Sequence, residues 1–148
     1  MDVSFSLKPF AALSAPELYQ LLRLREKVFI IEQNCVYEDI DGKDAKALHV
    51  LGHQNGEIVA YARLFKPGDY FPLASIGRVV VDPSLRGTGL GHELMNAAVS
   101  FLEQNLSAQP IQISAQAHLE KFYKQHGFEA RGAGYLEDGI PHVAMFRP

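Results

Sequence analysis

The first half of the chain changes its hydrophobic period twice. From Val3 to Phe10 apolar and polar residues alternate with period two, which predicts a strand. Ser14 and Glu17 have the spacing of a capping box, so a helix should begin there, with an apolar face formed by Leu18, Leu21, Leu22 and Val28. Residues 30–47 lose the period and are rich in acids, which indicates a loop with one short helical turn.

The middle of the chain reads as a hairpin followed by a crossover. Strands are expected at 49–53 and 58–65, joined at Asn55-Gly56, a dipeptide that favours tight hairpin turns. A buried strand at 76–81, a helix from about Leu90 to Gln104 and a strand at 111–115 then form a strand, helix and strand unit, so the two strands should be parallel.

The last third of the chain predicts a helix and a second hairpin. Leu119, Phe122 and Tyr123 share one face of a helix whose end is marked by Gly127. Strands are expected over Glu129–Tyr135 and His142–Phe146, around a turn at Asp138-Gly139.

The segment from Gly77 to Gly91 carries the clearest chemical signal. It leads a strand into a glycine-rich turn and then directly into a helix, whose first amides and positive dipole end can hold a diphosphate. The glycines allow a ligand to approach the backbone closely. The common dinucleotide motif would need glycine at His92, and the P-loop would need a Gly-Lys-Ser/Thr ending, so both are disfavoured.

Arg86, Gly89 and Gly91 match the Arg-x-x-Gly-x-Gly motif of the GNAT N-acetyltransferases, and the chain resembles that family. A later segment, from Gln116 to Phe128, is similar to the family's helix that carries Phe-Tyr and ends at Gly-Phe. The resemblance implies an α/β fold, α+β in some schemes: a mixed, mostly antiparallel central sheet with two splayed parallel strands, flanked by helices. It also implies acetyl-CoA as the cofactor, held by residues Val79, Val80, Val81, Arg86, Gly87, Thr88, Gly89, Leu90, Gly91, Gln116 and Tyr123.

Composition narrows the class of protein. With 148 residues, 47% of them hydrophobic, the chain suits a single domain over 1–148. A net charge of −3 without any Lys/Arg run argues against a nucleic-acid partner. The single cysteine cannot form an internal disulfide, and no signal-like start or membrane-length apolar run occurs, so a cytoplasmic protein is expected.

Acyl transfer to an amine requires a neutral amine, a donor to the developing oxyanion and a proton donor near the thiolate. By resemblance, a backbone N–H within Val79–Val81 polarises the thioester carbonyl and Tyr123 donates toward sulfur. A phenol near pKa 10 and a thiol near 8.5 differ by only about 1.5 units, so a strong hydrogen bond is sufficient. The alternative for Tyr123 is aromatic core packing with Phe122 and Phe128.

The chain departs from the family at two positions. Gln116 stands where many members carry asparagine, and Gly77 and Arg78 stand where a glutamate often serves as general base. Glu32 and His142 are the candidate bases, with His49 behind them, because a histidine suits a proton acceptor at neutral pH and a buried glutamate can do so. The simpler alternatives are a half-buried strand residue for His142 and a solvated loop or helix-end charge for Glu32. No metal site is expected, since the histidines lack ligand spacing.

Further segments resemble the ElaA-like branch of the family, which leaves the acceptor undefined: Val28–Gln33, Tyr37–Asp41, Gly77–Val81 and Glu137–His142. The acidic loop with Glu137 and Asp138 could attract a cationic acceptor, although a solvated acidic face is the simpler interpretation. Arg63 and Arg78 could instead bind a substrate carboxylate.

The leading hypothesis is therefore an acetyl-CoA-dependent N-acetyltransferase that acts on a small-molecule or peptide amine. Homodimers are common among the proteins that the chain resembles, although no stripe of residues in this sequence specifies a dimer interface. A non-catalytic acyl-CoA-binding module is the alternative, and a nucleotide-phosphate site on the same turn is a weaker third hypothesis.

Overall fold

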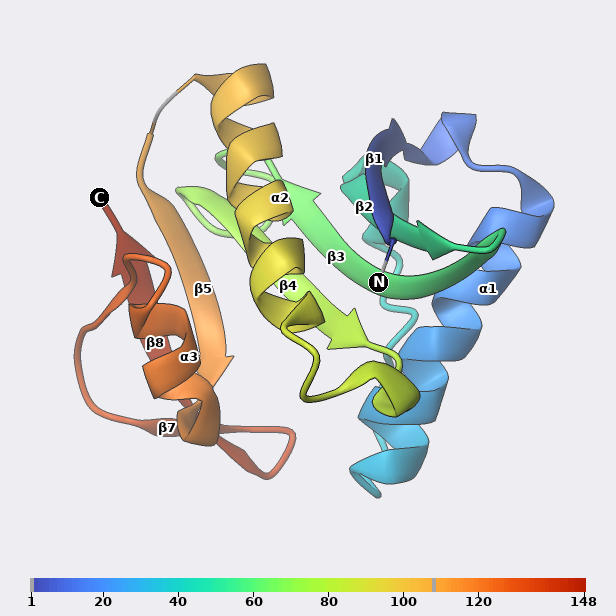
Figure 1. Ribbon diagram of the computed structural model, residues 1–148. Helices are drawn as coiled ribbons and strands as arrows, with labels where there is room; N and C mark the ends of the chain where they lie inside the picture. Colours follow the sequence, from blue (N-terminus) through green and yellow to red (C-terminus); the bar gives the residue numbers. More distant parts are fainter. Residues whose placement is uncertain (1, 108) are drawn as a thin grey trace.

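The computed structural model describes residues 2–107 and 109–148, and its strands form one mixed sheet of eight in the order β1-β2-β3-β4-β5-β8-β6, with β7 paired to β8 (Figure 1). Only β4 and β5 run parallel among the paired strands of these residues. The strands are β1 (Ser4–Pro9), β2 (Leu48–Gln54), β3 (Glu57–Phe65), β4 (Ala74–Val81), β5 (Ile111–Gln116), β6 (Glu129–Ala130), β7 (Tyr135–Glu137) and β8 (Ile140–Arg147). The fold is thus the GNAT fold that the resemblance implies.

The first helix begins as its sequence predicts. The Ser14 side chain accepts a hydrogen bond from the Glu17 amide, and the Glu17 carboxylate accepts one from the Ser14 amide, which completes the capping box. α1 (Ala15–Arg25) continues without a break into the π-helical η2 (Glu26–Glu32). Single helical turns follow elsewhere: η1 (Phe10–Ala12), η3 (Asp44–Lys46), η4 (Pro83–Leu85) and η5 (Ala117–Leu119).

Two long helices cover opposite faces of the sheet. Successive strand residues point to opposite faces, so Val50 of β2 joins the core under α2 (Leu90–Leu106), whereas its neighbour Leu51 packs with α1. The core under α2 also takes in Tyr123 of α3 (Glu120–Lys124) and Phe128 beyond it. In Figure 1, α2 lies across the region where β4 and β5 separate.

The parallel strands β4 and β5 meet only at their beginnings. Ala74 pairs with Ile111 and Ser75 with Gln112, and the strands then diverge. The register of β4 against β3 shifts between Tyr61 and Arg63, so that two β4 residues face one β3 residue. Arg78 lies in this bulge with φ of 49°, a left-handed conformation that is costly for a non-glycine residue. A bulge bends its strand, and this one lies on the part of β4 that no longer pairs with β5.

Most predicted elements are confirmed, including both hairpin turns, where Asn55-Gly56 and Asp138-Gly139 have positive φ at both residues. The predicted strand over Glu129–Tyr135 is wrong. Only Glu129–Ala130 and Tyr135–Glu137 form strands there, as β6 and β7. Gly132 has φ of 83° between them, which interrupts extended structure.

Candidate active site

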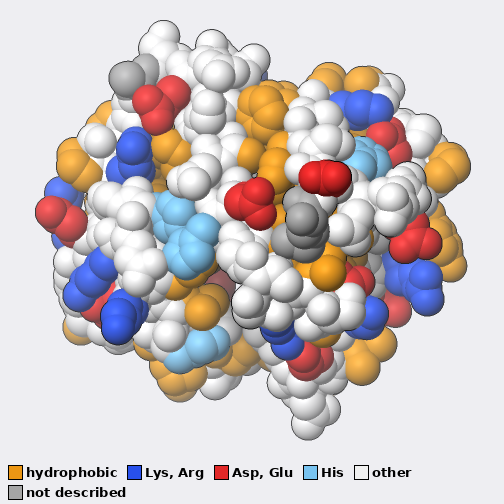
Figure 2. All heavy atoms as spheres, viewed as in Figure 1, with side chains coloured by type: hydrophobic (Ala, Val, Ile, Leu, Met, Phe, Trp, Pro, Cys, Tyr) orange, Lys and Arg blue, Asp and Glu red, His pale blue; other side chains and the backbone are white. Residues whose placement is uncertain are grey.

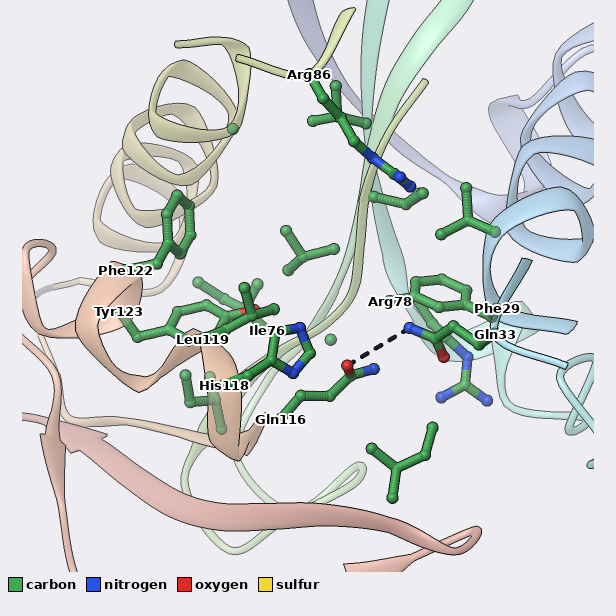
Figure 3. A pocket seen from close by; sticks show the side chains of 18 of the residues that line it. Phe29, Gln33, Ile76, Arg78, Arg86, Gln116, His118, Leu119, Phe122 and Tyr123 are labelled. Carbon is green, nitrogen blue, oxygen red and sulfur yellow. Dashed lines mark hydrogen bonds between the residues drawn. The ribbon is translucent and has the colours of Figure 1, made fainter. Parts of the chain in front are cut away.

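A cavity of about 800 Å³ occupies the fork between β4 and β5 (Figure 3). It brings together residues that the sequence predicts for the cofactor and for catalysis, from η2, β4, the glycine turn with the start of α2, β5, α3 and β8. Those lining the cavity are Glu32, Val79, Val80, Val81, Arg86, Gly87, Gly89, Leu90, Gly91, Gln116, Tyr123 and His142. Thr88 is not among the lining residues, and its hydroxyl donates to the Leu85 carbonyl at 2.6 Å. Thr88 therefore shapes the turn through its side chain.

The glycine turn requires glycine for its backbone angles. Gly87 and Gly89 have φ of 78° and 87°, and open space surrounds the point where either would carry a Cβ. Gly89 caps α2, and the amides of His92 and Glu93 both donate to its carbonyl oxygen. The amides of Leu90 and Gly91 precede that first bonded turn, beside the cavity, so this helix end can receive an anion.

The edge of β4 that faces β5 also borders the cavity. Residues 76–81 continue beyond the two paired positions of the parallel strands. Their β5-facing N–H and C=O groups have no partner strand among the described residues, although such groups are strongly driven to pair. The fork therefore presents a row of backbone donors and acceptors that a ligand with amide groups can satisfy.

Tyr123 reaches the cavity from α3 and is almost fully buried among aromatic rings. Its ring packs edge-on against Phe122 and Phe128, with centroids 5.2 and 6.1 Å away. Burial raises the pKa of the phenol to about 12. Packing and exposure to the cavity thus coexist: the ring is part of the core, and the residue still lines the cavity, as Figure 3 shows.

His142 is held in one orientation at another wall of the cavity. Its Nδ1 lies 2.7 Å from the Ile140 carbonyl oxygen, which can only accept, so Nδ1 carries the hydrogen and Nε2 has a free lone pair in the neutral ring. The Glu137 carboxylate lies 3.4 Å from Nε2. Ser114 donates to the same carboxylate at 3.1 Å, and the Tyr135 ring stacks on the imidazole.

Glu32 and Arg86 form an ion pair across the cavity. Both guanidinium Nη atoms donate to the carboxylate, at 2.5 and 2.6 Å. The hydrogen bonds from Arg86 lower the pKa of Glu32. A carboxylate whose pKa is lowered is a poorer proton acceptor.

The acidic loop is mostly not a solvated face, contrary to the simpler interpretation of its sequence. Asp44 accepts hydrogen bonds from the buried Arg25 and Arg63, at 2.8 and 3.0 Å. Asp39 pairs with Arg25 at 2.9 Å, and Asp41 accepts from Arg63 at 2.9 Å. A linear sequence does not reveal that three arginines from other elements converge on this loop. Both Nη atoms of Arg63 donate to these carboxylates, and the buried side chain lines no part of the cavity.

Arg78 is the third arginine of this network and the only one of the three that lines the cavity. Its Nε lies 2.8 Å from the Asp39 carboxylate, and its Nη2 donates to the Asp39 carbonyl at 3.2 Å. The Tyr37 ring lies under the guanidinium, 5.6 Å from centroid to Cζ. These contacts hold the side chain of the bulge residue against the acidic loop.

His49 is excluded as a base by its position. It is fully buried and lines no part of the cavity. Both ring nitrogens are occupied: Nδ1 lies 2.6 Å from the Tyr61 hydroxyl and Nε2 lies 2.9 Å from the Asp44 carbonyl. Burial also lowers the pKa of the imidazole.

Sequence reasoning did not assign a role to several cavity residues. Gln33 of the segment after η2 donates to the Gln116 side chain at 3.4 Å, a contact between residues far apart in sequence (Figure 3). Phe29, Ile76, His118 and Leu119 also line the cavity. The sequence signals that relate them to the site are the four-residue spacing of Phe29 and Gln33, and the position of His118 and Leu119 within the Gln116–Phe128 segment.

The described side chains offer no metal site, and the face drawn in Figure 2 offers no surface for a nucleic acid. On the face shown in Figure 2, basic side chains are interspersed with acidic ones and no broad basic surface is visible. Among residues 2–107 and 109–148, no group of three or more His, Cys, Asp or Glu side chains could hold a metal ion. Within the same part of the chain, every helix is too short or too polar to cross a membrane.

Comparison with known proteins identifies relatives along almost the entire chain. The acetyltransferase (GNAT) domain family matches residues 16–147. The protein ElaA of Escherichia coli K12 is 45% identical over 137 residues, which cover 91% of this chain and 90% of the relative. The crystal structure of E. coli ElaA aligns with a TM-score of 0.93 and 41% identity, covering 99% of this chain and 100% of that one.

A second solved structure, described as an acyl-CoA N-acyltransferase from Pseudomonas aeruginosa, aligns with a TM-score of 0.92 and 41% identity. It covers 98% of this chain and 99% of its own. The family match, the close relatives and the glycine turn at the strand fork agree. The chain belongs to the GNAT acetyltransferase family and is a GNAT-type acyltransferase.

Proposed function

We propose that this protein is an acetyl-CoA-dependent N-acetyltransferase that moves an acetyl group directly to a primary amine of a small molecule or peptide. The observation that carries the proposal is the single cavity shared by the glycine turn, the unpaired edge of β4, Tyr123 and His142. Its volume of about 800 Å³ lies within the range of small-molecule sites. An acyl donor and an acceptor can meet in it without a covalent enzyme intermediate.

The residues present fit coenzyme A. The helix end after Gly89 and the Arg86 guanidinium are suited to its diphosphate, which prefers amide and guanidinium donors. The open edge of β4 supplies backbone partners for the amides of the pantetheine arm. Gln116 of β5 lines the cavity on the opposite side of the fork and offers a side-chain amide. Bound acetyl-CoA supplies the reactive thioester. A backbone N–H within Val79–Val81 stabilises the charge that develops on the carbonyl oxygen.

His142, rather than Glu32, is assigned the role of base for the acceptor amine. Its Nδ1 is committed to the Ile140 carbonyl, which leaves the Nε2 lone pair available to take a proton. The Glu137 carboxylate beside Nε2 stabilises the imidazolium that forms and attracts an incoming ammonium ion. Glu32 is instead held in an ion pair with Arg86, which lowers the pKa of the carboxyl group and makes it a poorer proton acceptor.

Tyr123 is assigned the role of hydrogen-bond donor to the departing thiolate. With a phenol pKa of about 12 against a thiol near 8.5, complete proton transfer is uphill by about 3.5 units, or roughly 5 kcal/mol. The buried phenol therefore stabilises the thiolate by donating a hydrogen bond while keeping its proton.

The decisive experiment measures free thiol released from acetyl-CoA across a panel of polyamines, amino acids, aminoglycosides and peptides. Amine-dependent release is expected with at least one class. His142→Gln should lower kcat/KM for that amine by roughly 10²-fold, as for a positioned base. The control is His53→Gln, because His53 is a β2 histidine that does not line the cavity. Release that is equal with and without every amine contradicts the proposal.

A further inference from the structure

The segment of residues 32–35, which we term the strap, crosses from η2 to the opposite wall of the cavity. Three of its four side chains make contacts there. Glu32 pairs with Arg86 at the glycine turn, Gln33 donates to Gln116 at the end of β5, and the Cys35 thiol donates to the Asp138 carbonyl at 3.2 Å. The strap thus bridges the turn, the sheet and the β7–β8 hairpin within four consecutive residues.

Two of these contacts occupy groups that the coenzyme needs. Arg86 directs both Nη atoms at Glu32, although its place at the glycine turn suits a diphosphate. Gln116, which is proposed to lie beside the pantetheine arm, accepts from Gln33 with its side-chain oxygen. The closed strap and the bound coenzyme therefore compete for the same partners.

The strap contacts are weak enough to be exchanged. Glu32 and Arg86 are each more than 40% exposed, and an exposed ion pair changes an equilibrium constant by only about two- to fivefold. The Gln33 hydrogen bond is long, at 3.4 Å. A diphosphate carries more negative charge than one carboxylate, so it is the stronger partner for Arg86.

The backbone departs from regular α-helix both in the segment that leads into the strap and within the strap itself. η2 is π-helical over Glu26–Glu32, which is rare and common near functional sites. Asn34 has φ of 49°, in the left-handed region that asparagine tolerates better than most residues. The strap is therefore a short segment attached through irregular backbone, outside the regular part of the sheet.

We propose that the strap is closed across the cofactor groove in the free protein and that coenzyme entry opens it by exchanging Glu32 for the diphosphate at Arg86. The proposal rests on the proposed coenzyme site, and it adds a competing contact within the protein. Glu32 acts as a latch whose removal increases the open fraction. Because only the open state binds, the apparent coenzyme affinity scales with that fraction.

The first test needs no coenzyme, because the chain's single cysteine lies in the strap. Alkylation of the half-buried Cys35 by iodoacetamide, followed by intact mass spectrometry, compares the accessibility of the strap thiol between variants. Glu32→Gln should speed alkylation by about two- to fivefold. Glu26→Gln is the matched control, since Glu26 lies on the same π-helical segment, is exposed and does not line the cavity. Equal rates in the wild-type and Glu32→Gln proteins overturn the proposal.

A double-variant cycle separates the latch from a general charge effect. In an Arg86→Gln background the latch is already broken, so adding Glu32→Gln should leave the alkylation rate unchanged. If Glu32→Gln accelerates alkylation equally in both backgrounds, the effect does not pass through Arg86 and the proposal is wrong.

The second test measures acetyl-CoA affinity by isothermal titration calorimetry. Glu32→Gln should tighten binding by about two- to fivefold, whereas Glu26→Gln should leave it unchanged. Weaker binding of Glu32→Gln overturns the latch, because Glu32 then orients Arg86 for the coenzyme. If the wild-type protein binds no acetyl-CoA, the proposed function fails, while the alkylation test still decides whether the strap is latched.

Discussion

Nη1 of Arg25 donates to the Asp44 carboxylate across 2.8 Å, inside the protein and between residues that are 19 positions apart in sequence. Arg25 is fully buried, and Asp44 also accepts from Arg63, so one carboxylate neutralises parts of two buried cations. Removing one partner of such a network leaves charge buried without compensation.

Asp44→Asn should therefore lower the free energy of unfolding by roughly 3 kcal/mol. The measurement is urea unfolding followed by circular dichroism at neutral pH. Glu26→Gln provides a surface control and should change stability by less than about 0.5 kcal/mol. A cost for Asp44→Asn as small as that of the control would show that the network contributes nothing.

Acid sensitivity should follow from Asp41. Its hydrogen bonds from Arg63 and the Lys43 amide outweigh the opposing effect of burial, the largest single influence, and hold its pKa at about 2, below the ordinary 3.8. A depressed folded-state pKa contributes stability above the unfolded-state pKa and loses it as the pH falls toward the folded-state value.

The difference in unfolding free energy between wild type and Asp41→Asn should thus be full above about pH 4 and shrink toward pH 2. Urea titrations at several pH values would measure it. A difference that stays constant from pH 6 to pH 2 would mean that Asp41 titrates alike in both states.

Tyr123→Phe should lower kcat by roughly 10²-fold while leaving the fold intact, because the ring keeps its packing against Phe122 and Phe128. Steady-state kinetics with the best amine from the panel provide the measurement, and circular dichroism checks the fold. With a pKa of about 12, Tyr123 should not produce the alkaline limb of the pH–rate profile below pH 10. Unchanged turnover would remove Tyr123 from the mechanism.

Gly89→Val should abolish detectable coenzyme binding. Gly89 has φ of 87°, which valine adopts only with strain, although space for a Cβ exists there. The turn must then change its shape, and the amides at the start of α2 lose their alignment. Calorimetric titration with acetyl-CoA measures the loss, and Gly42→Val, in the acidic loop, controls for valine at another positive-φ glycine. Retained affinity would place the diphosphate elsewhere.

Local pattern was sufficient for most of the fold. The capping box at Ser14 and both hairpin dipeptides depend on residues adjacent in sequence, and all three were predicted correctly. The strand predicted over Glu129–Tyr135 failed because glycines within it permit a turn that hydrophobic alternation does not reveal. Helices, strands and turns could thus be predicted wherever the pattern that specifies them lies within a few consecutive residues.

The site was predictable only as far as its motif. The glycine turn and Tyr123 follow from the family resemblance, and the cavity unites them. The pairing of Glu32 with Arg86 and of Asp41 with Arg63 depends on contacts between distant segments, for which one sequence carries no signal. The sequence therefore predicts that the acidic side chains of the loop are exposed to solvent. In the folded protein, Asp39, Asp41 and Asp44 are instead paired with arginines.

The bulge at Arg78 lies where the central sheet is held together by few backbone hydrogen bonds. At this point β4 has left β5, and among the described residues the strands before the fork and those after it are joined by two paired positions of each strand, with α2 lying across the gap. A coenzyme lying in the fork would take the place of the missing ladder. The bound coenzyme would then connect the two halves of the divided sheet for as long as it stays in the fork.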